Sequence, residues 1–355
     1  MKAVALLMVS IVAGSALATA QSGLIEVASF GHNQCIGTKV APIGNRFFVS
    51  FPKHEPFLYA LTEIKNGQRV PYPDAAYQSS FKSVQDLWTD DQNQLWVLDS
   101  SPAGNAAAPG GSSNSGQGRF QLTAFDLKTN KATHIYKFND LPKDKSALND
   151  VRIDNLHHLA YLSDPGLCAI VVLDLQTGKS RVVLQNDRST KADPNFRLHL
   201  DGKDVIDDKG KPFSSNVNGI ALTTDNQYFY FRAINQTKLY RIKTEFLANT
   251  VLSDQELSAK VETVAVTGVC HGMTSDTKGN IFLSDSPNHA ITYISPDGKL
   301  HQLVKDHRII WPDSMGISPD GYLYFSCSQM NRLPKFNNGQ DKTEYPYRVY
   351  KVKLP

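Results

Sequence analysis

The residues of this chain that could carry chemistry share one position in a repeated sequence phrase. Five of the six copies have a polar or titratable residue there, and the first copy has an apolar one: Gln85, Asn149, Asn218, His271, Asp313 and Ile36. Asp86 and Asp150 directly follow two of them. Amide, imidazole and carboxylate groups around one axis could hold a hard cation such as Ca²⁺, hydrogen-bond an organic ligand or bind waters. The alternative is that these groups only satisfy turns and backbone at strand starts.

Among these residues, His271 is the best single candidate for acid–base chemistry. The ordinary pKa of an imidazole lies near neutrality, and Asp86 and Asp313 could orient or charge it. The alternative is a histidine that only binds a water. The sequence has no G-x-S-x-G elbow, no phosphate-cradling glycine loop and no H-E-x-x-H motif. Serine-hydrolase and zincin mechanisms are therefore not indicated.

The phrase that positions these residues is clearest in Leu148–Gly166, LNDVRIDNLHHLAYLSDPG. Two short runs of β-type residues flank a polar turn, which is typical of a β-hairpin. Six copies fall in register on one anchor position: Gly37, Asp86, Asp150, Gly219, Gly272 and Ser314. Seven residues later each copy has a turn residue: Gly44, Asn93, His157, Asn226, Gly279 and Gly321. An apolar second strand follows each turn.

Six repeats, with four strands expected in each, predict an all-β protein that forms a six-bladed β-propeller over residues 21–355. The strand predicted at Leu24–Phe30 stands before the first repeat, and Arg348–Leu354 ends the last one. We expect the N-terminal strand to close blade six, which removes the exposed sheet edges. The first strand of each blade then lines a central channel. The polar residues at the strand starts are expected at one channel mouth.

Phe57–Ile64 is predicted as the third strand of blade one. Four other segments depart from the repeat. Ser101–Gly118 has almost no apolar bulk and is predicted to be a loop. Gln185–Ser215 is a polar insertion of the size at which binding loops grow on a propeller face. A helix is predicted at Lys243–Leu252, and Gln329–Tyr345 is a polar excursion within blade six.

Residues 1–20 have the features of a signal peptide. Lys2 precedes an apolar run that is too short to span a bilayer, and Ala18-Thr19-Ala20 has the form of a signal-peptidase site. We expect cleavage after Ala20 and secretion to the periplasm or the medium, with no membrane contact in the mature form. A buried first helix is the alternative. The net charge of +3 is spread without a basic stripe, which argues against a nucleic-acid partner. We expect a monomer.

Export would permit disulfides between Cys35, Cys168, Cys270 and Cys327. Cys35 and Cys270 occupy the same repeat position in non-adjacent blades, beyond the reach of one disulfide. Buried free thiols are therefore the preferred interpretation. No CxxC pair is present, so a zinc site is disfavoured.

Several phrases together resemble the Yellow/major royal jelly protein family. They are LNDVRID, AYLSDPG, VNGIAL with TTDNQYFYF, KLYRIKTEFL, CHGMTSD with KGNIFLSD, and QMNRLPKF before the final RVYKVKL. The resemblance covers Cys35 to Leu354. It implies a secreted six-bladed propeller from a family that includes dopachrome-converting enzymes, amine-binding salivary proteins and food-storage proteins. Family membership alone does not define an activity.

A more distant resemblance is to the SMP-30/gluconolactonase propellers, which hold a divalent metal with a Glu, two Asn and an Asp. The two asparagines match Asn149 and Asn218, whereas the Asp and Glu positions are His271 and Ile36. Losing both carboxylates removes most of the charge that would hold Ca²⁺ or another divalent cation, although Asp150 could replace part of it. We therefore expect no resident cofactor.

The resemblance and the residues leave three functions open. The first is a small-molecule isomerase or tautomerase that moves a proton on a compound such as dopachrome, with His271 as base or acid and Asp86 and Asp313 as partners. The second is a non-catalytic protein that binds amines or small aromatics, with contacts from Gln85, Asn149, Asp150 and Asn218. The third is a metal-dependent lactonase.

Overall fold

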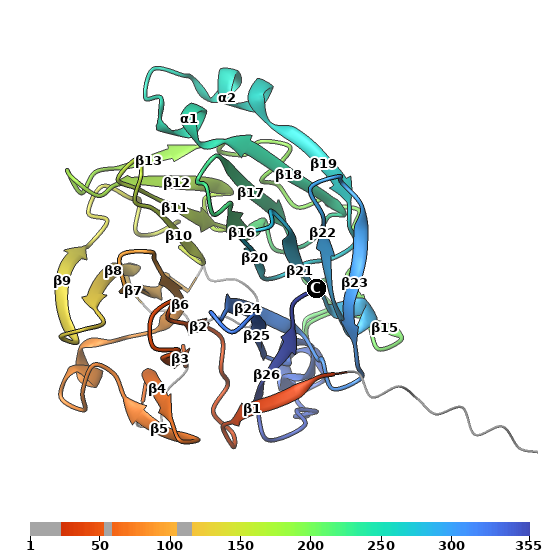
Figure 1. Ribbon diagram of the computed structural model, residues 1–355. Helices are drawn as coiled ribbons and strands as arrows, with labels where there is room; N and C mark the ends of the chain where they lie inside the picture. Colours follow the sequence, from red (N-terminus) through yellow and green to blue (C-terminus); the bar gives the residue numbers. More distant parts are fainter. Residues whose placement is uncertain (1–22, 53–58, 105–115) are drawn as a thin grey trace, which may run out of the picture.

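The computed structural model describes residues 23–52, 59–104 and 116–355. The predicted signal peptide and its cleavage site lie outside these residues, as do the first two residues of the strand predicted at Phe57–Ile64. Most of the loop predicted at Ser101–Gly118 also lies outside them. Within the described part, the chain forms six four-stranded antiparallel sheets that surround one axis (Figure 1). The prediction of an all-β six-bladed propeller is confirmed.

The first three blades follow the order of the sequence. Blade one contains β2 (Thr38–Val40), β3 (Phe47–Ser50), β4 (Leu61–Lys65) and β5 (Gln68–Pro71). Blade two contains β6 (Val84–Thr89), β7 (Gln94–Ser101), β8 (Arg119–Asp126) and β9 (Lys131–Tyr136). Blade three contains β10 (Val151–Asp154), β11 (Leu159–Asp164), β12 (Ala169–Asp174) and β13 (Ser180–Val183).

The last three blades complete the ring. Blade four contains β16 (Val217–Leu222), β17 (Tyr228–Ala233), β18 (Lys238–Lys243) and β19 (Glu262–Val266). Blade five contains β20 (Met273–Ser275), β21 (Ile281–Asp285), β22 (Ala290–Ile294) and β23 (Leu300–Lys305). Blade six contains β24 (Pro312–Ile317), β25 (Tyr322–Cys327), β26 (Arg348–Lys353) and the N-terminal β1 (Ile25–Ser29).

The N-terminal strand closes blade six as predicted. β1 pairs antiparallel with β26, and Ile25 lies opposite Lys351 while Ser29 lies opposite Arg348. The inner strands β2, β6, β10, β16, β20 and β24 each contact the inner strands of both neighbouring blades. The ring is therefore closed by hydrogen bonds between the two ends of the chain as well as by packing around the axis.

Packing between neighbouring blades explains why the second strands are so apolar. A sheet in a propeller is covered on both faces by adjacent sheets, so its middle strands need apolar side chains on both sides. Phe229 and Phe231 of β17 are fully buried and pack with Tyr161 of the preceding blade. In the same way Leu98 of β7 packs with Leu162 of β11.

Left-handed backbone explains the turn residues that recur seven positions after the anchors. Asn93 and Asn226 have φ angles of 59° and 57°, which asparagine tolerates better than most residues. In blade three His157 lies in the turn as predicted, and the left-handed residue is its neighbour His158 (φ 55°). Asp154 accepts hydrogen bonds from the backbone and ring nitrogens of His157, and these bonds hold that residue in the turn.

Close approach of neighbouring inner strands explains the glycine anchors of blades four and five. A Cβ at Gly219 would lie 2.4 Å from the backbone oxygen of His271, and one at Gly272 would lie 1.9 Å from that of Asp313. Both distances are far below van der Waals contact. Glycine at these anchors therefore lets the inner strands converge near the axis.

The irregular segments differ in detail from the prediction. The helix expected at Lys243–Leu252 is present as the shorter α1 (Thr244–Ala248). A second helix, α2 (Asp254–Lys260), follows just beyond that range, and Ser253 caps it together with Glu256 in a capping box. The insertion at 185–215 holds a small hairpin, β14 (His199–Leu200) with β15 (Lys203–Asp204). Short 3₁₀ turns lie at η1 (Tyr77–Ser80), η2 (Ser286–Asn288), η3 (Met330–Arg332) and η4 (Pro334–Phe336).

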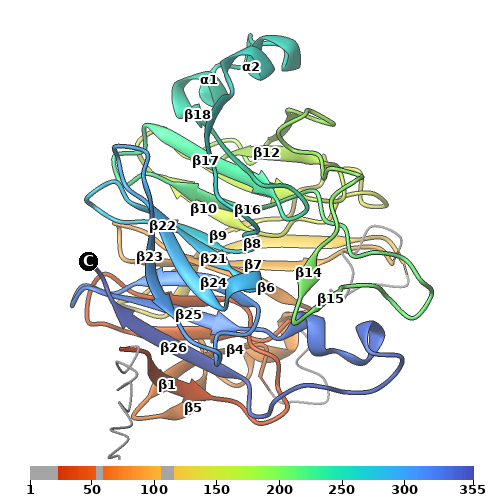
Figure 2. The ribbon, with the colours of Figure 1, turned by 90° about the vertical axis from the view of Figure 1, so that its right-hand side faces the viewer.

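The insertion and the excursion in blade six pack on each other at one end of the axis. Phe213 from the insertion and Phe336 of η4 join Trp311, which directly precedes β24. Figure 2 shows β14 and β15 on the opposite side of the molecule from the C-terminus. We call the end where the inner strands begin the upper mouth and the end where they stop the lower mouth.

The four cysteines are buried and unpaired, as the free-thiol interpretation expects. No helix in the described part of the chain is both long and apolar enough to cross a membrane.

Candidate functional site

The structure brings most of the predicted ring together at the upper mouth. Gln85, Asn218 and Asp313 are the second residues of β6, β16 and β24, whereas Asn149, Asp150 and His271 stand just before β10 and β20. Gln85 Nε2 donates to Asn149 Oδ1 at 3.3 Å, and Asn149 Nδ2 donates to Asp150 Oδ1 at 2.8 Å. Two neighbouring blades are thus linked through a chain of side-chain amides that ends on a carboxyl group.

Below this ring lies a buried ion cluster centred on Asp86. Arg152 Nη1 donates to Asp86 Oδ2 at 3.0 Å, and the backbone N–H of Val151 donates to the same oxygen at 3.1 Å. Ser314 Oγ donates to Asp86 Oδ1 at 3.3 Å. Arg152 Nη2 also donates to the carbonyl of Met273 at 2.9 Å, so the guanidinium joins blades two, three and five across the axis.

A second buried cation, Lys39 of blade one, completes the cluster. Its Nζ donates to Ser314 Oγ at 3.1 Å and to the carbonyl oxygen of Met315. Lys39 and Arg152 are each 2% exposed, so both cations depend on protein partners and not on water. Sequence reasoning missed both residues. The signal that could have found them is their position two residues after the anchors Gly37 and Asp150, on the channel-facing side of an alternating strand.

Burial changes the pKa values of the charged groups around the axis. It lowers the pKa of Lys39 to about 8, an effect that the nearby Asp86 opposes. Burial raises the pKa of Asp150 well above its usual range, and Asp86 adds to this rise. The pKa of Asp313 is raised to about 6 by the same two causes, although a hydrogen bond from Ser328 Oγ works against them. Two carboxyl groups at the upper mouth therefore hold their protons more tightly than ordinary aspartates.

His271 lies in a different environment from the one expected for a general base. It is 1% exposed, its ring stacks on Trp311 with centroids 4.1 Å apart, and neither ring nitrogen has a hydrogen-bond partner among the described residues. Burial, aided by Arg232, lowers its pKa to about 3. No described contact joins His271 to Asp86 or Asp313, because Asp86 pairs with Arg152 and Asp313 binds Ser328. The expected grouping of the three residues is therefore not observed.

The residues at the axis do not fit a resident divalent cation. Both side-chain groups of Asn149 already bond within the ring, and the Glu and Asp positions of the SMP-30 pattern are Ile36 and the buried His271. Two protein cations, Lys39 and Arg152, lie beside the carboxylates that a metal would need. Among the described residues, no group of three His, Cys, Asp or Glu side chains is arranged to hold a metal ion.

These features first define a class: a six-bladed β-propeller with a charged axis and a polar upper mouth. A gluconolactonase from Xanthomonas campestris is similar in structure, with a TM-score of 0.56, 12% identity and coverage of 94% of this chain and 89% of that chain. Regucalcin from Agrobacterium tumefaciens, a calcium-binding protein, has a TM-score of 0.54 and 14% identity over 93% and 96% of the two chains. Virginiamycin B lyase from Staphylococcus aureus has a TM-score of 0.53 and 12% identity, with coverage of 94% of this chain and 99% of that chain. Sequence identities as low as these show only that the chains share a fold.

The sequence adds the family. A sequence model described as major royal jelly protein matches residues 82–355. The chain therefore belongs to the major royal jelly protein family, as the phrases LNDVRID and CHGMTSD predict. The structural neighbours of gluconolactonase type agree with the more distant resemblance. No curated protein sequence is similar enough to match this chain.

Proposed function

We propose that this member of the major royal jelly protein family binds a small aromatic molecule at the upper mouth and moves a proton on it, as an isomerase or tautomerase of quinones or imines such as dopachrome. The observation that carries the proposal is the pair of carboxyl groups of Asp150 and Asp313. Each has one oxygen with no hydrogen bond from a described residue, and burial raises the pKa of each.

The two carboxyl groups suit opposite roles. Asp313, with a pKa of about 6, is ionised at neutral pH and can accept a proton from an acidic C–H bond beside the imine. Burial and the nearby Asp86 raise the pKa of Asp150 well above its usual range, which favours the protonated form that can donate to the quinone oxygen. The electrons of the broken C–H bond pass through the conjugated ring to that oxygen, so the reaction needs no oxidant. Gln85, Asn149 and Asn218 would orient the substrate through their amide groups.

The structure supports a different base from the one that the sequence suggests. A neutral imidazole with a pKa of about 3 is a weak proton acceptor, and the indole of Trp311 covers one face of the His271 ring. In the proposed reaction Asp313 is therefore the base. His271 contributes an uncharged, rigid wall, and Asp86 contributes by holding Lys39 and Arg152 in place.

Dopachrome turnover in the purified mature protein tests the proposal. We expect Asp313→Asn to lower kcat/KM by at least about 100-fold, the low end for a general base. In the wild type, kcat/KM should rise through about pH 6 as Asp313 ionises. Asp144→Asn makes the same change at an exposed site and should leave the rate unaltered. Wild-type protein that turns over no member of a quinone and imine panel, or Asp313→Asn with full activity, would contradict the proposal.

A second candidate function, amine binding without turnover, is favoured by the same free carboxyl oxygens. An aromatic amine could place its ammonium group between Asp150 and Asp313. Calorimetric titration with dopamine or serotonin separates the two functions. Saturable binding that Asp313→Asn weakens at least about tenfold, with no product formed, supports a binding protein. Absence of both amine binding and turnover excludes both functions.

We further propose that the mature chain starts at Gln21, is exported and is a monomer. The support for cleavage and export is the sequence pattern of residues 1–20. Intact mass and light scattering of protein exported from cells test these points. A retained N-terminus or a dimer mass would contradict them.

A further inference from the structure

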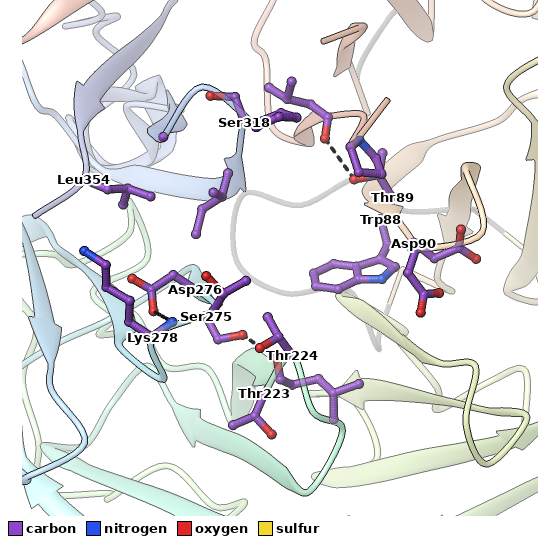
Figure 3. A pocket seen from close by; sticks show the side chains of 18 of the residues that line it. Trp88, Thr89, Asp90, Thr223, Thr224, Ser275, Asp276, Lys278, Ser318 and Leu354 are labelled. Atoms are coloured by element: carbon purple, nitrogen blue, oxygen red, sulfur yellow. Dashed lines mark hydrogen bonds between the residues drawn. The ribbon is translucent and has the colours of Figure 1, made fainter. Parts of the chain in front are cut away.

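The lower mouth contains a cavity that none of the proposed chemistry uses. Its volume is about 750 Å³, within the range of sites that hold a small organic ligand. The turns that follow the inner strands surround it. Apolar wall residues come from several blades: Val40, Pro42, Ile153, Leu222, Ile317 and Pro319. Figure 3 shows the Trp88 indole projecting into this space between the turns that carry Thr224 and Ser318.

Trp88 separates the cavity from the ion cluster. The guanidinium carbon of Arg152 lies 4.9 Å from the centroid of the indole, and Lys39 Nζ lies 5.9 Å from it. Trp88 is the half-buried tryptophan of the chain, whereas Trp96 and Trp311 are each 3% exposed. No described residue accepts a hydrogen bond from its indole N–H. An aromatic ring with a free face and a free donor is thus available to a molecule in the cavity.

The polar groups of the wall are mostly engaged with the protein itself. Thr89 Oγ1 donates to the carbonyl of Val40 at 3.0 Å, and Ser275 Oγ donates to that of Leu222 at 2.5 Å. The Asp276 carboxylate accepts from backbone N–H groups of its own turn and from Asn280 Nδ2. Asp90 likewise accepts from its turn and from Trp96 Nε1. The wall therefore presents mainly apolar surface to a ligand.

Charge distinguishes the two mouths. At the upper mouth, Asp150 and Asp313 each have a carboxyl oxygen without a hydrogen bond from a described residue. At the lower mouth, two cations lie against the indole, and the wall carboxylates of Asp90, Asp91 and Asp276 accept hydrogen bonds from protein groups. A cationic ligand stacked on Trp88 would be repelled by Arg152 and Lys39. An uncharged aromatic ligand would gain stacking and apolar burial without that cost. We infer that the lower mouth is a second ligand site, separate from the upper one, for uncharged planar aromatic molecules that stack on Trp88.

The uncharged naphthalene dye prodan, whose emission reports a dry environment, is the probe for this site. We expect saturable binding with a blue shift and quenching of tryptophan emission. Trp88→Ala should weaken binding at least tenfold, and Trp88→Phe should restore it to within about threefold of wild type. The cation 1-naphthylmethylamine should compete at least tenfold more weakly than the uncharged 2-naphthol.

A variant pair at exposed threonines controls for effects on the fold. Thr224 is exposed on a turn at the rim of the cavity, and Thr177 is exposed on an outer turn away from it. Thr224→Trp should fill the cavity and abolish prodan binding, whereas Thr177→Trp should leave it unchanged. No saturable binding, or equal affinity in wild type, Trp88→Ala and Thr224→Trp, overturns the site. Stronger competition by the amine than by 2-naphthol overturns the ligand class.

Discussion

The buried pair of Asp86 and Arg152 gives the sharpest stability prediction. Asp86→Asn keeps the shape of the side chain and removes its charge. The amide oxygen can still accept from Arg152 and from the Val151 N–H, but its NH₂ group then faces Ser314 Oγ. That hydroxyl already accepts from Lys39 Nζ and from the Thr38 N–H. The substitution therefore leaves Lys39 and Arg152 without the Asp86 charge beside them, and it leaves the Ser314 hydroxyl facing hydrogen-bond donors on all of these sides.

Two lines of reasoning give the same magnitude. A unit pair about 4 Å apart in an effective dielectric of about 20 is worth about 4 kcal/mol. Removing one partner of a buried ion pair costs about 3 to 5 kcal/mol, because the other charge stays desolvated. The exposed side-chain fractions of Arg152 and Asp86 are 2% and 3%, so solvent screens this pair little. We expect Asp86→Asn to lower the free energy of unfolding by about 4 kcal/mol.

Guanidinium denaturation of wild type and variant measures this loss, and urea with added NaCl tests its screening. The loss should stay the same between low salt and about 1 M NaCl, a concentration that screens surface pairs. Glu262→Gln is the matched control, because its pair with Arg241 is 47% and 33% exposed, and should cost less than about 1 kcal/mol. Combining Asp86→Asn with Arg152→Gln should cost less than the sum of the two.

A loss below about 1 kcal/mol in Asp86→Asn, or a loss that disappears with salt, would refute the reasoning. Either result would mean that water reaches the cluster. Strictly additive single and double variants would show that Asp86 and Arg152 do not stabilise each other.

Three further predictions follow from the same structure. The pKa of Asp313 is raised to about 6 in the fold, so its stabilising contribution is complete below about pH 4 and is lost as the pH rises through 6. In denaturation experiments, the free energy of unfolding of Asp313→Asn should equal that of wild type at pH 4 and exceed it by about 1 to 3 kcal/mol at pH 7. An equal difference at both pH values would contradict this. Gly272→Ala should lower the free energy of unfolding by about 3 kcal/mol or more, because its Cβ would overlap the Asp313 carbonyl. Gly298→Ala, on an open turn, should lower it by about 1 kcal/mol. Similar shifts in melting temperature for the two variants would count against the close approach at Gly272. Alkylation without reductant should label none of the thiols of Cys35, Cys168, Cys270 and Cys327 in the folded protein and all four after unfolding. A mass that shows two cysteines unlabelled after unfolding would reveal a disulfide and contradict the prediction.

Much of the fold could be predicted because the evidence for it is local. The hairpin phrase of Leu148–Gly166 recurs six times, and each copy has its own alternation and its own turn residue. In blade three the turn predicted at His157 is present, and only the structure shows that His158 is the left-handed residue while His157 bonds to Asp154. The helix expected at Lys243–Leu252 is present as the shorter α1, and the Ser253 cap starts a further helix, α2, just beyond it.

The polar ring could also be predicted in part. Equivalent positions of a repeat must lie at equivalent heights around the axis, and Gln85, Asn149 and Asp313 all lie where the inner strands of their blades begin. The role of His271 could not be read from its type. Its pKa depends on burial beside Trp311, which itself packs against Phe213 of the insertion, and these contacts join segments that are far apart in the chain.

By itself, the sequence determined the number of blades, the closing strand, the family and the height of the polar residues, because each follows from a period that repeats along the chain. Only the tertiary structure decided what occupies the axis. Asp86 meets Arg152 across 66 positions and Ser314 across 228, and Lys39 reaches Ser314 across 275. Such contacts form only when the ring closes, because closure removes water from these charges and leaves each one only the partners on neighbouring blades. The same closure separates the upper mouth, with Asp150 and Asp313, from a mainly apolar lower cavity at Trp88.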